Sequence, residues 1–495
     1  MREFENYECV VGLECHVQLC TRSKLFSQAP NRYAAAPNTL LQEVDAGLPG
    51  SLPTLNAQVV DFALRLGFAL QCDIQQTSEF ARKHYFYPDL PKGYQISQYD
   101  RPICFSGRLP FTRKDGSGGQ VMLQRIHIEE DAGKNLHSQD SPLSYVDYNR
   151  AGAALLEVVT EPQLHSVDDA MQAVKSLRSI VMYLGICDGN MQEGSLRADV
   201  NISVRKKGCK QMGTRTEIKN LNSIRFMGQA IAYESRRQIL QLQEGKSIQH
   251  ETRAWDDNRK ETRSLRSKEQ QHDYRYFPDP DLPVLHVSNT QLQHIQKTLP
   301  ELPGQKKQRL CQALGLSAYD AQLLTADKAL VDYFEEALRV HNNPKALANW
   351  ILNEVLRVVK EQTSTEPEAA TGFTPPLSAD NLGQLVKLLD DGSISTPIAK
   401  QVFEELLQHP KQTPLQIVQQ KGWHVQRDTQ QLQQIIQQVL QDCPTEVNKY
   451  LAGKTRLFGH MMGQVMRLSK GQADPKQARD CLQAALDKLQ RNPQA

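Results

Sequence analysis

The sequence lacks the short signatures of several common enzyme classes. It has no G-x-x-x-x-G-K-[ST] and no G-x-G-x-x-G, so neither a P-loop nor a Rossmann nucleotide site is indicated. It also has no H-E-x-x-H and no G-x-S-x-G, the patterns of zinc peptidases and of many serine hydrolases. Any nucleotide would therefore have to bind on the face of a sheet, through side chains and a metal ion.

Long apolar runs and paired cysteines are missing as well. No uncharged stretch approaches the roughly 18–20 apolar residues that span a bilayer, so we expect no membrane contact. The ten cysteines show no C-x-x-C pair and no zinc-finger spacing, which is typical of free thiols in a reducing compartment. The N-terminus is acidic and resembles neither a signal peptide nor a transit peptide. We therefore expect a cytoplasmic protein.

What is present is a balanced composition. The 495 residues include 58 Lys and Arg, 56 Asp and Glu and 39% hydrophobic residues, as in a soluble globular protein of about two to four domains. The net charge of +2 excludes uniform coating of nucleic acid, but it averages over domains. Residues 411–495 hold 12 Lys and Arg against 6 Asp and Glu, a local net of +6 that leaves −4 elsewhere. A basic tail of this kind is expected to meet a polyanion, unless the charge is incidental to a helical domain.

Three segments differ in their patterning. Residues 1–292 are rich in Gly, Pro and strand-like alternation, whereas residues 293–407 space apolar residues at three and four. Residues 408–495 are basic, and Leu432, Ile436 and Val439 give their Gln-rich tract a helical period. The sequence therefore predicts an α+β protein, with a mixed or antiparallel sheet domain followed by an all-α helical domain and an all-α tail domain.

The first predicted strand carries a carboxylate and an imidazole on one face. Residues 10–19 alternate, so Glu14 and His16 point to the same side about 7 Å apart. That spacing allows both side chains to reach one metal ion or one proton. The alternative is an ordinary strand whose polar side faces solvent.

Two further strands mix cations and carboxylates. Residues 195–208 and 213–223 are expected to pair as a hairpin, with Arg197 and Asp199 facing outward on one strand and Glu217 on the other. Carboxylates hold divalent cations and guanidinium groups fork onto phosphate oxygens, so this face suits a phosphate and metal pocket.

Residues 124–134 supply another candidate carboxylate. Glu130 shares a face with Ile126 and Ile128, and a carboxylate on an apolar face needs a partner such as a metal ion. The alternative is that the strand ends at Ile128 and leaves Glu129 and Glu130 in a turn.

Basic and aromatic residues alternate in residues 80–102, around Lys83, and again in residues 273–283. Such segments can bind phosphate and stack a base. They can equally form a Pro-rich loop packed by its own rings.

Seven long motifs follow one another along the chain, in residues 10–27, 82–100, 125–134, 148–162, 191–205, 216–223 and 273–283. Together they resemble the B subunit of the heterotrimeric aspartyl/glutamyl-tRNA(Asn/Gln) amidotransferases. The resemblance extends through residues 453–475, which are similar to the C-terminal tRNA-binding domain of that family. The related archaeal E subunit carries an inserted domain that does not fit within 495 residues, so the B subunit is favoured.

The resemblance implies a cradle-shaped catalytic domain related in fold to glutamine synthetase. It implies a ligase that uses ATP and Mg2+ to phosphorylate the side-chain carboxylate of mischarged Glu-tRNA(Gln), Asp-tRNA(Asn) or both. Ammonia released from glutamine by an amidase-type A subunit then forms the amide, and a small C subunit completes the heterotrimer.

The resemblance also assigns roles to residues of this sequence. His16, Glu130 and Glu217 are expected to bind Mg2+, with Glu130 favoured over Glu129. Glu14 and Asp199 are expected to orient the metal and ammonia side of the site, and Lys83 and Arg197 to contact phosphate. The expected tRNA contacts in the tail are Lys454, Arg456, Arg467 and Lys470.

Two other functions stay open at this point. One is a non-catalytic tRNA-binding scaffold subunit of the same complex, with structural acidic residues. The other is a free-standing enzyme, similar to glutamine synthetase, that acts on a small amino acid and leaves the basic tail idle.

Overall fold

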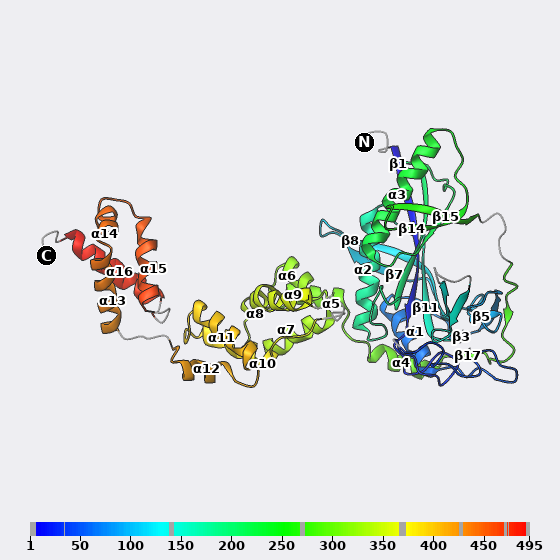
Figure 1. Cartoon of the computed structure of the whole chain (residues 1–495), viewed down its shortest axis with the longest axis horizontal. Helices are drawn as coiled ribbons and strands as arrows, with labels where there is room; N and C mark the ends of the chain where they lie inside the picture. The colour runs from blue at the N-terminus through cyan, green and yellow to red at the C-terminus, as the bar shows by residue number, and fades with distance from the viewer. Residues whose placement is uncertain are drawn as a thin grey trace. The chain divides into compact units, whose positions relative to one another are not determined.

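The computed structural model describes most of the chain and divides it into two compact units, Met1–Gln305 and Lys306–Ala495. The described residues are 6–33, 35–137, 143–267, 273–365, 373–424, 429–469, 473 and 475–491. The labelled strands all lie in the first unit (Figure 1). The chain is thus a mixed α/β protein with a large mixed sheet and a C-terminal helical region.

A ten-stranded sheet forms the centre of the first unit. Its strand order is β15-β14-β13-β12-β1-β11-β8-β6-β2, with β7 paired to β8. Within the described pairings of this sheet, β13 and β14 run parallel and the other neighbours antiparallel. The strands are β1 (Tyr7–Gln18), β2 (Asp73–Ile74), β6 (Cys104–Phe105), β7 (Arg108–Thr112), β8 (Gly118–Glu130), β11 (Ala154–Thr160), β12 (Leu196–Lys206), β13 (Thr216–Lys219), β14 (Glu251–Asp256) and β15 (Glu261–Ser267).

Three small sheets flank the large one. β4 (Ala81–His84) pairs with β5 (Tyr94–Ser97) and with β16 (Phe277–Pro278), which brings the two aromatic and basic segments side by side. The other two pairs are β3 (Thr77–Ser78) with β17 (Leu285–His286) and β9 (Lys134–His137) with β10 (Ser144–Asp147).

Helices pack on the apolar face of the large sheet. α1 (Ala57–Ala69), α2 (Val167–Tyr183) and α3 (Ile224–Gln243) bury their apolar residues in one core with the strands, and α4 (Asn289–Lys297) contacts α1. Each of the first three begins at a polar residue whose side chain accepts a backbone hydrogen bond from the first turn, and these caps stabilise the helix starts. The capping residues are Asn56, Ser166 and Ser223.

The predicted alternation of the strands is confirmed. In β1, Leu13, Cys15 and Val17 are buried in the core, while Glu14 and His16 lie on the other face. β12 and β13 pair antiparallel as the expected hairpin. β8 continues through Glu130 and both of its terminal glutamates are buried, so the alternative of a strand ending at Ile128 is wrong.

The second unit is helical, as expected from its apolar spacing. A π-helical turn, Ile351–Val355, joins α8 and α9. The helices are α5 (Pro303–Gln312), α6 (Ala318–Leu324), α7 (Lys328–Val340), α8 (Pro344–Trp350), α9 (Leu356–Thr365), α10 (Ala379–Asp390), α11 (Thr396–Gln408), α12 (Pro414–Lys421), α13 (Thr429–Asp442), α14 (Pro444–Leu451), α15 (Leu457–Leu468) and α16 (Pro475–Arg491). No described helix has both the length and the apolarity to cross a membrane.

The basic tail has an apolar core of its own. Helices α13 to α16 contact one another around Leu432, Ile436 and Val439, the residues that gave the Gln-rich tract its helical period. The predicted boundary between residues 292 and 293 falls inside α4, and the one between 407 and 408 falls at the end of α11. The three-domain division of the chain stays a prediction.

Candidate active site

A large cavity opens on the polar face of the central sheet. Its volume is about 1110 Å³, and its walls come from β1, β8, β11, β12 and β13 together with the segments around β4 and Tyr274. Charged residues of both signs line it, including His16, Lys83, Glu129, Asp131, Arg150, Glu157, Arg197, Asp199 and Lys219. The walls thus offer oxygen ligands for a cation and donors for an anion.

Strand register aligns one row of this wall. His127, Glu157, His16 and Arg197 are successive partners across β8, β11, β1 and β12. Because paired residues point to the same side of a sheet, their side chains converge on one face. The antiparallel pairing therefore assembles groups that lie far apart in the sequence.

Glu129, two residues after His127 in β8, joins Glu157 and the two histidines of this row. His16 Nε2 lies 3.6 Å from Glu129 Oε1 and 3.5 Å from Glu157 Oε2. His127 Nε2 lies 3.5 Å from Glu129 Oε2 and 3.3 Å from Glu157 Oε2. The two carboxylates therefore face both imidazoles, at distances longer than a good charge-assisted hydrogen bond.

The pKa values of this group follow from mutual attraction inside the protein. Burial alone would lower the pKa of His127, but Glu157 and Glu129 raise it to about 9. The same carboxylates, Glu157 first, outweigh burial and raise the pKa of His16. Burial would raise the pKa of Glu157, yet His127 and His16 hold it well below its ordinary value. The two imidazoles and Glu157 thus stabilise each other's charged forms.

The same group fits a divalent cation. One ligand atom each from His16, Glu129 and Glu157 lies within 4.8 Å of the others, close enough to share an ion. Two carboxylates suit Mg2+, while the imidazole nitrogen also suits softer divalent ions. His127 Nδ1 is buried and has no hydrogen-bond partner within the described residues. A divalent ion would replace the imidazole protons as the positive charge between the carboxylates.

Asp131 holds two arginines at the edge of the cavity. It accepts hydrogen bonds from Arg150 Nη2 at 2.7 Å and from Arg197 Nη2 at 2.9 Å. Burial would raise the pKa of Asp131, but Arg197 and Arg150 lower it. Arg197 is 40% exposed, so part of its guanidinium faces the cavity.

Lys83 supplies a second cation. Its Nζ lies 5.0 Å from the centre of the Tyr274 ring, and both residues line the cavity. Burial would lower the pKa of Lys83, but Glu129 is the leading influence that raises it. The ammonium group therefore stays charged, and none of the ion pairs found among the described residues involves it.

A second acidic group lies beside the first on the same sheet face. Glu14 pairs with Asp199 in the register of β1 and β12 and accepts a hydrogen bond from Asn201 at 2.7 Å. Lys219 Nζ lies 3.0 Å from both Asp199 Oδ2 and Glu217 Oε1. Burial, and then Glu157 and Glu217, raise the pKa of Glu14. Glu14 lines a smaller cavity of about 250 Å³, and Asp199 lines the larger one. The two carboxylates therefore lie where the two cavities adjoin.

Comparison with known proteins identifies the family to which this chain belongs. The GatB/GatE catalytic domain family matches residues 9–293, and the GatB domain family matches residues 332–486. The chain belongs to the GatB/GatE catalytic domain family.

Curated members of this family are similar over nearly their whole length. The Geotalea daltonii protein is 47% identical over 98% of this chain and 99% of its own length. The Myxococcus xanthus protein is 45% identical over 97% of this chain and 99% of its own length. Both carry the name of the B subunit of an aspartyl/glutamyl-tRNA(Asn/Gln) amidotransferase.

The structure brings together most of the predicted site residues of this family member. His16, Lys83, Arg197 and Asp199 line the large cavity, while Glu14 and Glu217 belong to the adjoining acidic group. These predicted residues therefore lie on one face of the sheet, beside the large cavity.

Glu130 does not join His16, and the predicted grouping of these two residues is wrong. Its carboxylate accepts hydrogen bonds from Lys92 Nζ at 2.6 Å and from the Ile96 backbone at 2.8 Å, on the opposite side of β8 from Glu129. The parity of the strand was read correctly, because Glu130 does share the face of Ile128. Among the described residues, Lys92 is the charged partner that offsets its burial.

Sequence reasoning missed Glu157 and His127 and ranked Glu129 behind Glu130. Glu157 is the one charged residue in β11, whose other residues are mainly buried and apolar. A lone carboxylate in such a strand is a detectable signal, since burying it is costly without a partner. The pairing of β11 with β1, which gives Glu157 its partner His16, could not be read from the sequence.

The tail residues are only partly described. Lys454, Arg456 and Arg467 are exposed in the segment from α14 to α15. Lys470 lies outside the described residues.

Proposed function

We propose that this chain activates the side-chain carboxylate of mischarged Glu-tRNA(Gln), Asp-tRNA(Asn) or both, as the B subunit of a glutamine-hydrolysing tRNA amidotransferase. The single observation that supports this most is the cavity in which Glu129 and Glu157 face His16. The basic side chains of Lys83 and Arg197 line the same cavity. Relatives that match it from end to end carry the corresponding name. The sheet domain would then be a cradle of the glutamine synthetase kind.

The first step is transfer of the γ-phosphoryl group of ATP to the carboxylate. A free carboxylate is a poor acyl donor, because its oxygen is a poor leaving group, and phosphorylation supplies a better one. His16, Glu129 and Glu157 would hold a divalent cation, which offsets the repulsion between ATP and the attacking carboxylate. Lys83 and Arg197 would bind phosphate oxygens from the wall of the cavity.

The second step is attack by ammonia on the acyl phosphate, which releases phosphate and leaves a proton to be removed. Glu14 and Asp199 stand beside the phosphate-binding wall, with Glu217 next to them. The raised pKa of Glu14 brings it nearer to neutrality, as suits a general base. We assign acceptance of this proton to the pair of Glu14 and Asp199. We assign to Glu217 a role in binding a divalent cation.

The partners follow from the same assignment. An amidase-type A subunit would release ammonia from glutamine, and a small C subunit would join the two in a cytoplasmic heterotrimer. The exposed Lys454, Arg456 and Arg467, with Lys470, would bind the tRNA phosphates.

A paired substitution tests the function. In the purified complex with Glu-tRNA(Gln), we expect Glu129→Gln to lower ATP- and Mg2+-dependent phosphate release by about a hundredfold or more, because it removes a cation ligand. Glu130→Gln is the matched control one residue away, and its smaller effect should appear mainly in stability. Full phosphate release by Glu129→Gln would contradict the proposal and favour a non-catalytic scaffold.

A further inference from the structure

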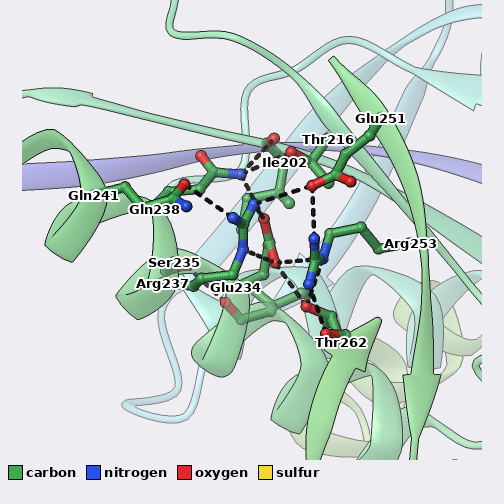
Figure 2. A network of polar contacts seen from close by, with 11 residues as sticks. Ile202, Thr216, Glu234, Ser235, Arg237, Gln238, Gln241, Glu251, Arg253 and Thr262 are labelled. Carbon is green, nitrogen blue, oxygen red and sulfur yellow. Dashed lines mark hydrogen bonds and ion pairs between the residues drawn. The ribbon is translucent and has the colours of Figure 1, made fainter. Parts of the chain in front are cut away.

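A network of polar side chains lies behind the sheet, on the side of α3 (Figure 2). Glu234 of α3 is fully buried at its centre and accepts hydrogen bonds from Arg237 at 2.6 Å, Gln238 at 3.0 Å and Thr262 at 2.8 Å. Arg253 of β14 lies 3.5 Å from the same carboxylate and donates to Thr262 at 2.9 Å. Glu234 thereby ties the helix to β14 and β15.

The network also reaches the neighbouring strands. Gln238 Nε2 donates to Thr216 Oγ1 at 3.2 Å and to the Ile202 carbonyl at 3.4 Å, in β13 and β12. Glu251 of β14 accepts a hydrogen bond from Arg253 at 2.6 Å. Figure 2 shows these side chains converging between α3 and the strands. One buried carboxylate therefore connects α3 to the strands on this side of the sheet.

In β13 and β14, a residue adjacent to a member of this network lies on the opposite face of the sheet, the face of the candidate active site. Glu217 follows Thr216 in β13, and Thr252 precedes Arg253 in β14. Glu217 and Thr252 are partners in the parallel pairing of these strands, and Thr252 Oγ1 donates to Glu217 Oε2 at 2.9 Å. Thr252 is 1% exposed, so water does not compete for its hydroxyl.

We propose that Glu234 and Thr252 are positioning residues for the site carboxylate Glu217. Thr252 holds one oxygen of Glu217 in place, while Lys219 lies 3.0 Å from the other. Glu234 acts indirectly. It holds Arg253 in place, and Arg253 is the neighbour of Thr252 in β14. This inference rests on the proposed role of Glu217 in binding a divalent cation.

Thr252→Val tests the first link, because it removes the hydroxyl and keeps the shape of the side chain. Mn2+ binding to the full chain in its complex is followed by electron paramagnetic resonance. We expect Mn2+ affinity to fall by about ten- to a hundredfold, the range for a lost hydrogen bond to a charged group. Thr252→Ser should restore it. Wild-type Mn2+ affinity in Thr252→Val would overturn the proposal.

A matched control separates positioning from general loss of packing. Thr325→Val removes another buried threonine hydroxyl, one that donates to the Ala321 carbonyl in α6. It should leave Mn2+ affinity unchanged at a similar cost in melting temperature. An equal loss of Mn2+ affinity in this control would also overturn the proposal.

Glu234→Gln tests the second link. It keeps the shape of the side chain but leaves Arg237 and Arg253 without their central carboxylate. We expect a lower melting temperature together with a weaker Mn2+ affinity, and a lower melting temperature alone would make Glu234 merely structural. Because Mn2+ binding needs no amidation, a wild-type complex that binds Mn2+ but forms no amide would refute the proposed function and leave this test intact.

Discussion

The two faces of the central sheet carry charged groups that are paired in different ways. Behind the sheet, Glu234 accepts short hydrogen bonds of 2.6–3.0 Å from Arg237, Gln238 and Thr262. In the cavity, the four contacts of His16 and His127 with Glu129 and Glu157 measure 3.3–3.6 Å. Both groups are largely buried, so burial alone does not distinguish them.

The difference lies in what the partners can do. An arginine keeps its proton at any physiological pH, so the charge of Glu234 is matched permanently by this chain. A histidine can give up its proton, so the carboxylates of the cavity can exchange imidazolium for a divalent ion. Carboxylates that face a titratable partner therefore suit a binding site, whereas carboxylates that face arginine suit a structural clamp.

The largest expected effects come from removing one carboxylate on each face of the sheet, Glu157 in the cavity and Glu234 behind it. Glu157→Gln should lower ATP-dependent phosphate release by more than about a hundredfold. Its cost in stability should be smaller, because His16 and His127 can become neutral. Glu234→Ala should instead lower the free energy of unfolding by about 3–5 kcal/mol, since it removes the buried carboxylate that Arg237 binds and leaves Glu251 as the carboxylate nearest to both arginines.

Chemical unfolding and phosphate release, measured on both variants, check this contrast. If Glu157→Gln unfolds as readily as Glu234→Ala, the cavity group is a structural clamp too and the comparison between the faces fails.

Much of this arrangement follows from the sequence, and the remainder depends on strand neighbours. The alternation of Leu13, Cys15 and Val17 was sufficient to place Glu14 and His16 together on the polar face of β1. Periodicity cannot say which strand lies beside β1, so the contact of His16 with Glu157 was out of reach.

The error at Glu130 has a physical cause. An acidic residue on an apolar face does need a partner, but the pattern does not identify it. Lys92 lies 38 residues earlier in the chain and reaches Glu130 because β5 brings its loop to the end of β8. A buried carboxylate thus predicts that a partner exists, without indicating whether it is a metal ion or a lysine.

A smaller effect is expected from pH in the absence of divalent cations. The folded protein raises the pKa of His127 to about 9 from its ordinary value of 6.5. A raised pKa means that the folded state binds the proton more tightly, so the resulting stability is complete below about pH 6.5. It is lost as pH rises toward 9, by on the order of 3 kcal/mol if the shift is fully expressed.

Urea unfolding of the chelated protein at pH 6.5, 8 and 9.5 measures this loss. His127→Gln should flatten the profile over the same window. Saturating Mg2+ should flatten it as well, because the ion replaces the proton. A profile of equal slope in wild type and His127→Gln would assign the pH dependence to other groups.

The smallest expected effect concerns the basic tail, where Lys454, Arg456 and Arg467 are exposed and are proposed to attract tRNA at long range. Replacing Lys454, Arg456 and Arg467 by Gln should weaken tRNA binding about tenfold and reduce the slope of log K against log salt by about three, one for each lost phosphate contact.

Arg339, Lys345 and Lys387 are also exposed, and replacing them by Gln changes the net charge equally. The control should leave the slope unchanged if the tail binds tRNA directly. Equal slopes in the two triple variants would mean that net charge alone attracts tRNA. Phosphate release at saturating tRNA should stay at the wild-type rate in both variants, because neither set of residues lines the cavity that contains His16 and Glu157.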